Sequence, residues 1–398
     1  MAAAQTQLGG EGPFGTGGVE DAAMTQTTPL ALTAALVVGC AGLLMPGVQP
    51  MVLGALVSAQ RLDVHQLTQA ATVEMLALGA VSALLAGTVR HRRLRVWGLG
   101  GLLLLGLANL GCLSADGLAL IAVRGLAGAG GGILVWIATG LVTRHAQALR
   151  LSAVFLGVQA LSQAGLAGVI PSFAGSLGAD AGLVLLAAGA GVGLPFLLAL
   201  PRDLPDLPKP HTGHGSLTAP GIVGLLSTFL LMAGIVGVWV FVEQLAKQHG
   251  IAPATVSFSI AASLATQVAG AAFIAWIGPR VSPAAGLVLV SLGYLVALAV
   301  LAFVAGDSAY LGATLLFGFL WTTGMPLFVP LLIRVDPTRR AAMLLPGAQL
   351  LGSSAGPQIT GALVTGDNLQ PVLVVGAALF AATIAAVLTA IALRARSH

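Results

Sequence analysis

The stretch PRDLPDLPKPHTGHGSLT occupies residues 201–218 and divides the chain into two halves of similar length. It is the longest polar segment in the interior of the sequence, and its prolines are unfavourable inside a helix. Long apolar runs lie on both sides of it. We therefore expect a linker over 201–218 that joins two domains, 29–200 and 219–398.

The composition indicates that lipid is the main solvent of the chain. Hydrophobic residues make up 57% of the sequence and charged residues 8%, whereas a soluble domain carries about 25% charged residues. In lipid, backbone groups must be satisfied within helices or closed barrels. The apolar runs are continuous and do not alternate with polar residues as barrel strands do, so they predict helices.

Twelve apolar runs are long enough to cross a bilayer, which takes about 20 residues. Six precede the linker and six follow it. The sequence thus predicts an all-α membrane protein with twelve transmembrane helices in two pseudo-symmetric six-helix bundles. The expected spans are 30–58, 66–89, 95–113, 117–141, 151–175, 179–200, 221–246, 254–277, 283–305, 309–333, 341–364 and 370–393.

The basic residues predict the orientation. With twelve spans, fourteen of the 17 lysines and arginines fall on the side that holds the linker and both termini, and only Arg61 and Lys247 fall on the other. By the positive-inside rule that side is cytoplasmic. The basic pI near 9.7 therefore reflects topology in a multi-pass inner-membrane protein, and no nucleic-acid partner is expected.

Several other classes find no support in the sequence. Residues 1–28 lack the basic and apolar regions of a signal peptide and are expected to be a disordered tail. Cys40 and Cys112 lie in apolar runs, so a disulfide framework is not expected. No spacing indicates a metal site, a phosphate-binding loop or a catalytic grouping, so we expect no cofactor and no enzyme.

An internal repeat supports the division into halves. Gly157 and Gln159 recur as Gly347 and Gln349, 190 residues later, at the same place in each half. A parallel repeat of six helices is typical of the two halves of a major facilitator transporter.

The chain resembles the major facilitator superfamily, in particular its bacterial twelve-helix efflux branch, over roughly residues 30–393. Leu120, Arg124, Gly128 and Gly130 are similar to the family motif Leu-x-x-x-Arg-x-x-x-Gly-x-Gly. The resemblance implies alternating access and an arginine near the central cavity that is tied to proton coupling. The family's loop between helices 2 and 3 is degenerate here, since Thr88 stands in place of its aspartate.

Glu74 and Arg124 are the charged residues deepest within the spans, and charges there are costly enough to indicate function. Both lie about eight residues from the outer face, roughly 12 Å deep at 1.5 Å per residue, a similar depth at which they can pair. Glu74 is either a proton-titrating carboxylate or half of a permanent clamp. Arg124 is either a substrate or coupling residue or the other half of that clamp.

Polar and aromatic residues at the expected centre are further candidates for substrate contact. Pro46 and Pro50 should kink the first helix, which makes Gln49 either a cavity residue or a partner of neighbouring backbone. Interhelical hydrogen bonds are the commoner role for such residues. The remaining candidates are Gln159, Gln163, Gln349, Trp239, Trp321 and Glu243, the last favoured as a solvated interfacial acid.

These features together predict a secondary transporter, most simply a monomer, that moves a small organic molecule by proton-coupled efflux in contact with membrane lipid. The alternative is a carrier of a small organic anion anchored by Arg124. A non-transporting receptor is disfavoured because the loops are too short for a sensor domain.

Overall fold

The computed structural model describes residues 28–142, 144, 148–204, 217–304, 306–338, 340–365 and 368–396. Regular structure in these ranges is helical, apart from one isolated bridge between Thr365 and Asn368. Residues 1–27 of the expected tail and 205–216 of the expected linker lie outside the described part.

The helices follow the twelve expected spans, some of them in two pieces. In chain order they are α2 (Pro29–Gly42), α3 (Leu44–Ser58), α4 (Val64–Thr88), α5 (Leu94–Gly111), η2 (Cys112–Ser114), α6 (Gly117–Val142), α7 (Ala148–Leu177), η3 (Gly178–Asp180), α8 (Ala181–Gly193), η4 (Pro195–Ala199), α9 (Ala219–Trp239), α10 (Val242–Gln248), α11 (Pro253–Ile277), η5 (Gly278–Arg280), α12 (Pro283–Phe303), α13 (Asp307–Gly324), η6 (Met325–Leu327), α14 (Phe328–Val335), α15 (Arg340–Gly361) and α16 (Gln370–Arg396).

Four expected spans are interrupted, among them the sixth, where α8 ends at Gly193 and η4 begins at Pro195. The first breaks at Leu43, three residues before Pro46, because a proline ring clashes with the carbonyl four residues earlier. The tenth tightens into η6 around Pro326 for the same reason. The expected span 221–246 is not one helix, since it ends at Trp239 and α10 restarts at Val242.

By length and composition alone, ten segments of the described chain qualify as membrane spans. One of them, Val154–Ala199, contains most of α7 and all of α8, so it accounts for two passes. The pass that does not qualify is α15, which carries two internal prolines, Pro346 and Pro357, and several polar side chains. These passes make the chain a multi-pass membrane protein.

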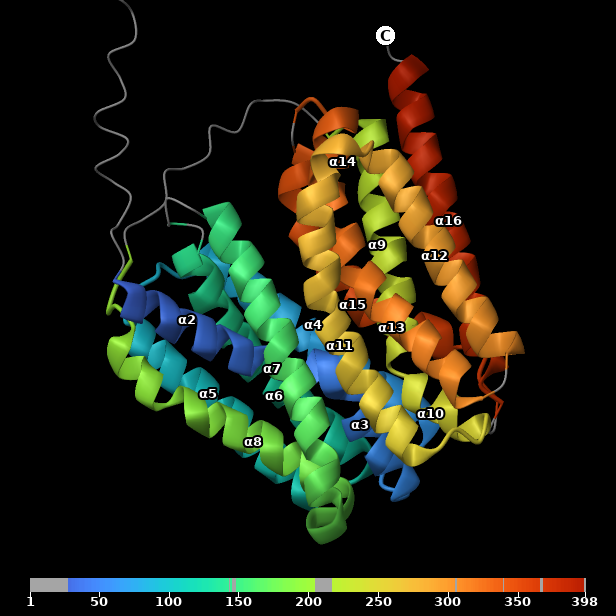
Figure 1. Cartoon of the computed structure of the whole chain (residues 1–398). Helices are drawn as coiled ribbons and strands as arrows, with labels where there is room; N and C mark the ends of the chain where they lie inside the picture. Colours follow the sequence, from blue (N-terminus) through green and yellow to red (C-terminus); the bar gives the residue numbers. More distant parts are fainter. Residues whose placement is uncertain are drawn as a thin grey trace, which may run out of the picture.

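The helices form two groups, α2–α8 and α9–α16 (Figure 1). The groups adjoin through α4 with α15 and through α7 with α11. They meet again where α3 lies beside α10, and they spread apart toward the end that carries the C-terminus (Figure 1). This is the architecture of two six-helix bundles that the sequence predicted.

Close packing in each half depends on a glycine at the same place in the repeat. A Cβ at Gly128 of α6 would strike the backbone carbonyl of Glu74 in α4, and a Cβ at Gly318 of α13 would strike that of Ser263 in α11. Gly128 and Gly318 are 190 residues apart, the spacing that also separates Gln159 from Gln349. The repeat is therefore visible in the helix contacts as well as in the amino-acid sequence.

Candidate functional site

Glu74 and Arg124 form the ion pair that their similar depth allows. Arg124 Nε donates to Glu74 Oε2 at 3.1 Å and a terminal nitrogen of Arg124 donates to Glu74 Oε1. Glu74 is 2% exposed and Arg124 is fully buried. The pair lies where α4 and α6 touch, because Gly128 is one turn from Arg124 and brings the two backbones together.

Asn109 of α5 completes this cluster and was not among the residues singled out from the sequence. Its side-chain oxygen accepts from the other terminal nitrogen of Arg124 at 2.7 Å, and its amide nitrogen donates to the Leu105 carbonyl at 2.8 Å. Each guanidinium nitrogen of Arg124 thus donates to a side chain of its own half. The one signal for Asn109 is that it is an isolated amide in an apolar run.

Two side chains reach the carbonyl oxygens at the bend of the first helix. Gln163 of α7 donates to the Leu43 carbonyl at 2.6 Å. Trp239 of α9 donates its indole N–H to the Gly47 carbonyl at 3.1 Å, which joins the two halves. Gly47 has no side chain, and a Cβ there would overlap Gln163. Both predicted residues therefore hydrogen-bond the backbone on either side of Pro46, at the bend of the first helix.

A row of side chains continues from Trp239 through the second half. Trp321 of α13 meets Trp239 edge to face, with ring centroids 6.1 Å apart. Met325 is one turn beyond Trp321, and its sulfur accepts from Gln349 Nε2 of α15 at 3.6 Å. Trp321, Met325 and Gln349 are half-buried, whereas Trp239 is 1% exposed. We call Trp239, Trp321, Met325 and Gln349 the central row.

The structure places the two remaining glutamines differently. Gln159 is half-buried one turn from Gln163 on α7 and makes no side-chain hydrogen bond with the described residues. Gln49 is fully buried, and both its amide atoms lack a partner in the described structure. Its role as a cavity residue stays a prediction.

Glu243 lies at the seam between the halves. It accepts from Lys247 Nζ at 2.6 Å, and Lys247 also donates to Ser58 Oγ of the first half at 2.7 Å. The Glu243 side chain is only 12% exposed and packs against Gly54. It is therefore a contact between halves, in contrast to the solvated interfacial acid favoured from the sequence.

Arg61 joins three interhelical connections at one end of the first half: the α3–α4 loop in which it lies, the α5–α6 connection and the α7–α8 connection. It pairs with Asp116 at 2.7 Å and with Asp180 at 2.5 Å, and it also donates to the carbonyls of Cys112 and Ala115. Burial lowers the pKa of the guanidinium, but the two carboxylates outweigh it and the pKa is raised. Arg61 therefore stays charged and holds these interhelical connections together.

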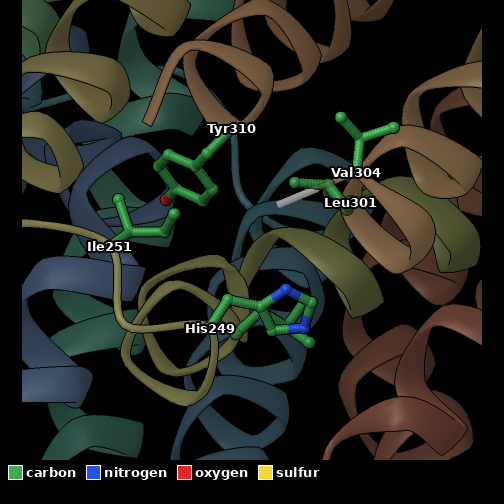
Figure 2. A pocket seen from close by; sticks show the side chains of 6 residues that line it. His249, Ile251, Leu301, Val304 and Tyr310 are labelled. Atoms are coloured by element: carbon green, nitrogen blue, oxygen red, sulfur yellow. The ribbon is translucent and has the colours of Figure 1, made fainter. Parts of the chain in front are cut away.

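A small pocket lies in the second half, beside the α10 helix that carries Glu243 and Lys247. Its walls are Leu245, His249, Ile251, Leu301, Val304 and Tyr310 (Figure 2). It has space of about 10 Å³, enough for about one water molecule, and the Tyr310 hydroxyl donates to the Val242 carbonyl at 3.2 Å. Among the described residues, no three His, Cys, Asp or Glu side chains are grouped so as to hold a metal ion.

The fold now described, two six-helix bundles repeated in parallel, is that of a major facilitator protein. No protein-family model and no curated protein sequence matches the chain. A crystal structure of the nucleoside transporter NupG is similar, with a TM-score of 0.69 and 11% sequence identity, over 91% of this chain and 99% of that one. At this identity the similarity shows the fold.

Proposed function

We propose that the protein is a secondary transporter that moves a small organic solute across the inner membrane by alternating access. One chain contains both halves of the fold, so we take the transport unit to be a monomer. The observation that carries the proposal is the uneven contact between halves. Two hydrogen bonds between described residues join them, from Trp239 to Gly47 and from Lys247 to Ser58.

Both bonds lie between the middle of the first helix and the end where α3 meets α10, and the halves spread apart toward the other end (Figure 1). A protein that works by alternating access closes one end while the other is open. With the orientation predicted from the basic residues, the closed end is external and this conformation faces the cytoplasm.

Glu74 is the proposed proton carrier, and the proposed transport is proton-coupled efflux of the solute. The buried pair is stable only while Glu74 is ionised, because a neutral carboxyl gives up its charge attraction to Arg124. Protonation from the external side would thus loosen the contact between α4 and α6. Anchoring of an organic anion by Arg124 is less favoured, since each of its nitrogens already donates to Glu74 or Asn109.

The test is proton flux in liposomes that contain the full chain and an internal pH dye. Uridine, nicotinamide, nicotinate and ethidium are supplied in turn. Wild type is expected to couple the movement of one of them to proton movement, and Glu74→Gln to retain solute exchange without proton movement. Asp307→Asn, at an exposed acid where α13 begins, is the control and should remain coupled. Coupled flux in Glu74→Gln equal to wild type would overturn the assignment.

A further inference from the structure

We propose that the transported solute is an uncharged molecule with a flat ring, held by Trp321 and by the carboxamides of Gln159 and Gln349. This deepens the proposed function and rests on it. The inference comes from a comparison of the charged and polar side chains within the helices: some already have a charge or hydrogen-bond partner in the described structure, and others do not.

The charged side chains in the interior of the described helices are already paired with one another. Glu74 and Arg124 neutralise each other within the first half, and Glu243 and Lys247 do so at the seam. The other charged residues in the described helices stand at helix ends. A charged solute at the centre would leave water without a counter-charge, which is strongly unfavourable. The centre therefore favours a neutral solute.

The central row offers an aromatic wall. Trp239 is fixed by its bond to Gly47 and by stacking on Phe317, with centroids 6.1 Å apart and planes 19° apart. Trp321 rests against it edge to face but remains half-buried, and its indole N–H has no partner among the described residues. A half-exposed indole beside a fixed one is suited to a flat ring, since aromatic pairs prefer stacked or edge-on contact.

One carboxamide, Gln349, lies beside this wall, and the repeat places a second, Gln159, at the equivalent position of the other half. Gln349 Nε2 donates to the Met325 sulfur, a weak acceptor, and its oxygen has no partner in the described structure. Gln159 occupies the equivalent place in the first half, 190 residues earlier, and its carboxamide has no partner among the described residues. A carboxamide offers both donor and acceptor without charge, so the pair matches neutral groups such as amides or ring nitrogens.

A purely apolar solute fits less well. It would cover the two carboxamides and leave their hydrogen-bonding groups unpaired, which costs about 1–3 kcal/mol for each unsatisfied group. The chemistry on both sides of the centre thus points to a solute that combines a ring with neutral polar groups.

The experiment uses pairs of compounds that share a ring and differ in charge: nicotinamide and nicotinate, benzamide and benzoate, indole-3-acetamide and indole-3-acetate. Binding to the full chain in lipid nanodiscs is measured by thermal shift and by quenching of tryptophan fluorescence. Wild type is expected to bind at least one amide about tenfold more tightly than the matching acid, the effect of about one hydrogen bond to an uncharged partner.

Variants then locate the contact. Gln349→Leu, Gln159→Leu and Trp321→Phe should each weaken binding of that amide by about tenfold at most. Gln358→Leu, at an exposed position of the same α15, and Trp276→Phe, which is 69% exposed, should leave it unchanged. Equal loss in the controls would overturn the assignment of the residues.

The outcome separates this inference from the proposed function. If the acids or ethidium bind as tightly as the amides, or if none of the three amides binds, the substrate class is wrong. Proton-coupled flux of a charged solute would then still support a secondary transporter. If no solute of either panel is carried or bound, the proposed function itself fails.

Discussion

Trp239 of α9 donates its indole N–H to the backbone carbonyl of Gly47 in α3, 3.1 Å away, and so fastens the second half to the bend in the first helix. The acceptor is backbone, so substitution can remove the donor but not the acceptor. Trp239→Phe keeps an aromatic ring against Phe317 and removes the donor, together with part of the ring volume.

This variant is expected to shift the population away from the closed end. One net hydrogen bond is worth about 0.5–1.5 kcal/mol, a change of about two- to twelvefold in the ratio of the two states. Disulfide formation between Ser58→Cys and Lys247→Cys, introduced together, reports that closure. Trp239→Phe should slow the crosslink, and Trp276→Phe, at an exposed tryptophan, should not. An unchanged crosslinking rate would mean that the bond does not hold the halves together.

Truncation of Arg124 should lower the thermal stability strongly. Arg124→Ala leaves the Glu74 carboxylate buried without a counter-charge, which costs about 3–5 kcal/mol. The double variant Glu74→Gln with Arg124→Gln removes both charges and should recover most of the thermal stability. If the double variant is no more stable than Arg124→Ala, the pairing is not what Arg124 contributes.

Asn109→Leu provides an independent test of the cluster. It removes the acceptor of one guanidinium nitrogen of Arg124 and leaves that donor unsatisfied at a buried site, at a cost of about 1–3 kcal/mol. Thermal unfolding measures the effect. The loss should largely vanish when Arg124 is already replaced by Gln, because the donor is then no longer charged.

Gly128→Ala should be destabilising although alanine is the better helix former. The added Cβ strikes the Glu74 backbone, and overpacking of this kind costs about 1–3 kcal/mol. Gly100→Ala in α5 is the control, because a Cβ there meets nothing within 4 Å. It should be neutral or slightly stabilising. A melting temperature that falls equally in both variants would contradict the packing argument.

Asp336 lies just beyond α14, and its lowered pKa predicts that the stability of the protein falls as the pH becomes acidic. Burial raises its pKa, but hydrogen bonds from Ala341 N–H, Thr338 and Thr218 together outweigh burial and lower it. A lowered folded pKa stabilises the protein above the ordinary value of about 3.9, and that contribution is lost as pH falls through the folded pKa.

Asp336→Asn should therefore be less stable than wild type at pH 7 and should lose less further stability between about pH 5 and pH 3. Melting temperatures across this range give the measurement, with Thr218→Val as a milder variant of the same site. An acid-side loss in Asp336→Asn as large as in wild type would exclude this contribution.

The fold was largely predictable because the apolar runs, the charge distribution and the polar stretch at 201–218 are each strong signals. The similar depth of Glu74 and Arg124 indicated that they could pair. Interruptions at Val240 and Phe241 carry no proline and were not foreseen. The bond from Trp239 to Gly47 spans 192 residues, and Asn109 stands alone, so neither has a local pattern that reveals it.

The polarity of α15 has a consequence for how the protein is made. The helix is not apolar enough to qualify as a span by itself, and its glycines 352 and 356 lie directly on the backbone of α9. Entry into the bilayer as an isolated segment is therefore unfavourable, because its polar side chains would face lipid. The helix α9 is synthesised earlier and presents the surface that receives it, so assembly of the second half is itself a condition for the insertion of its eleventh pass.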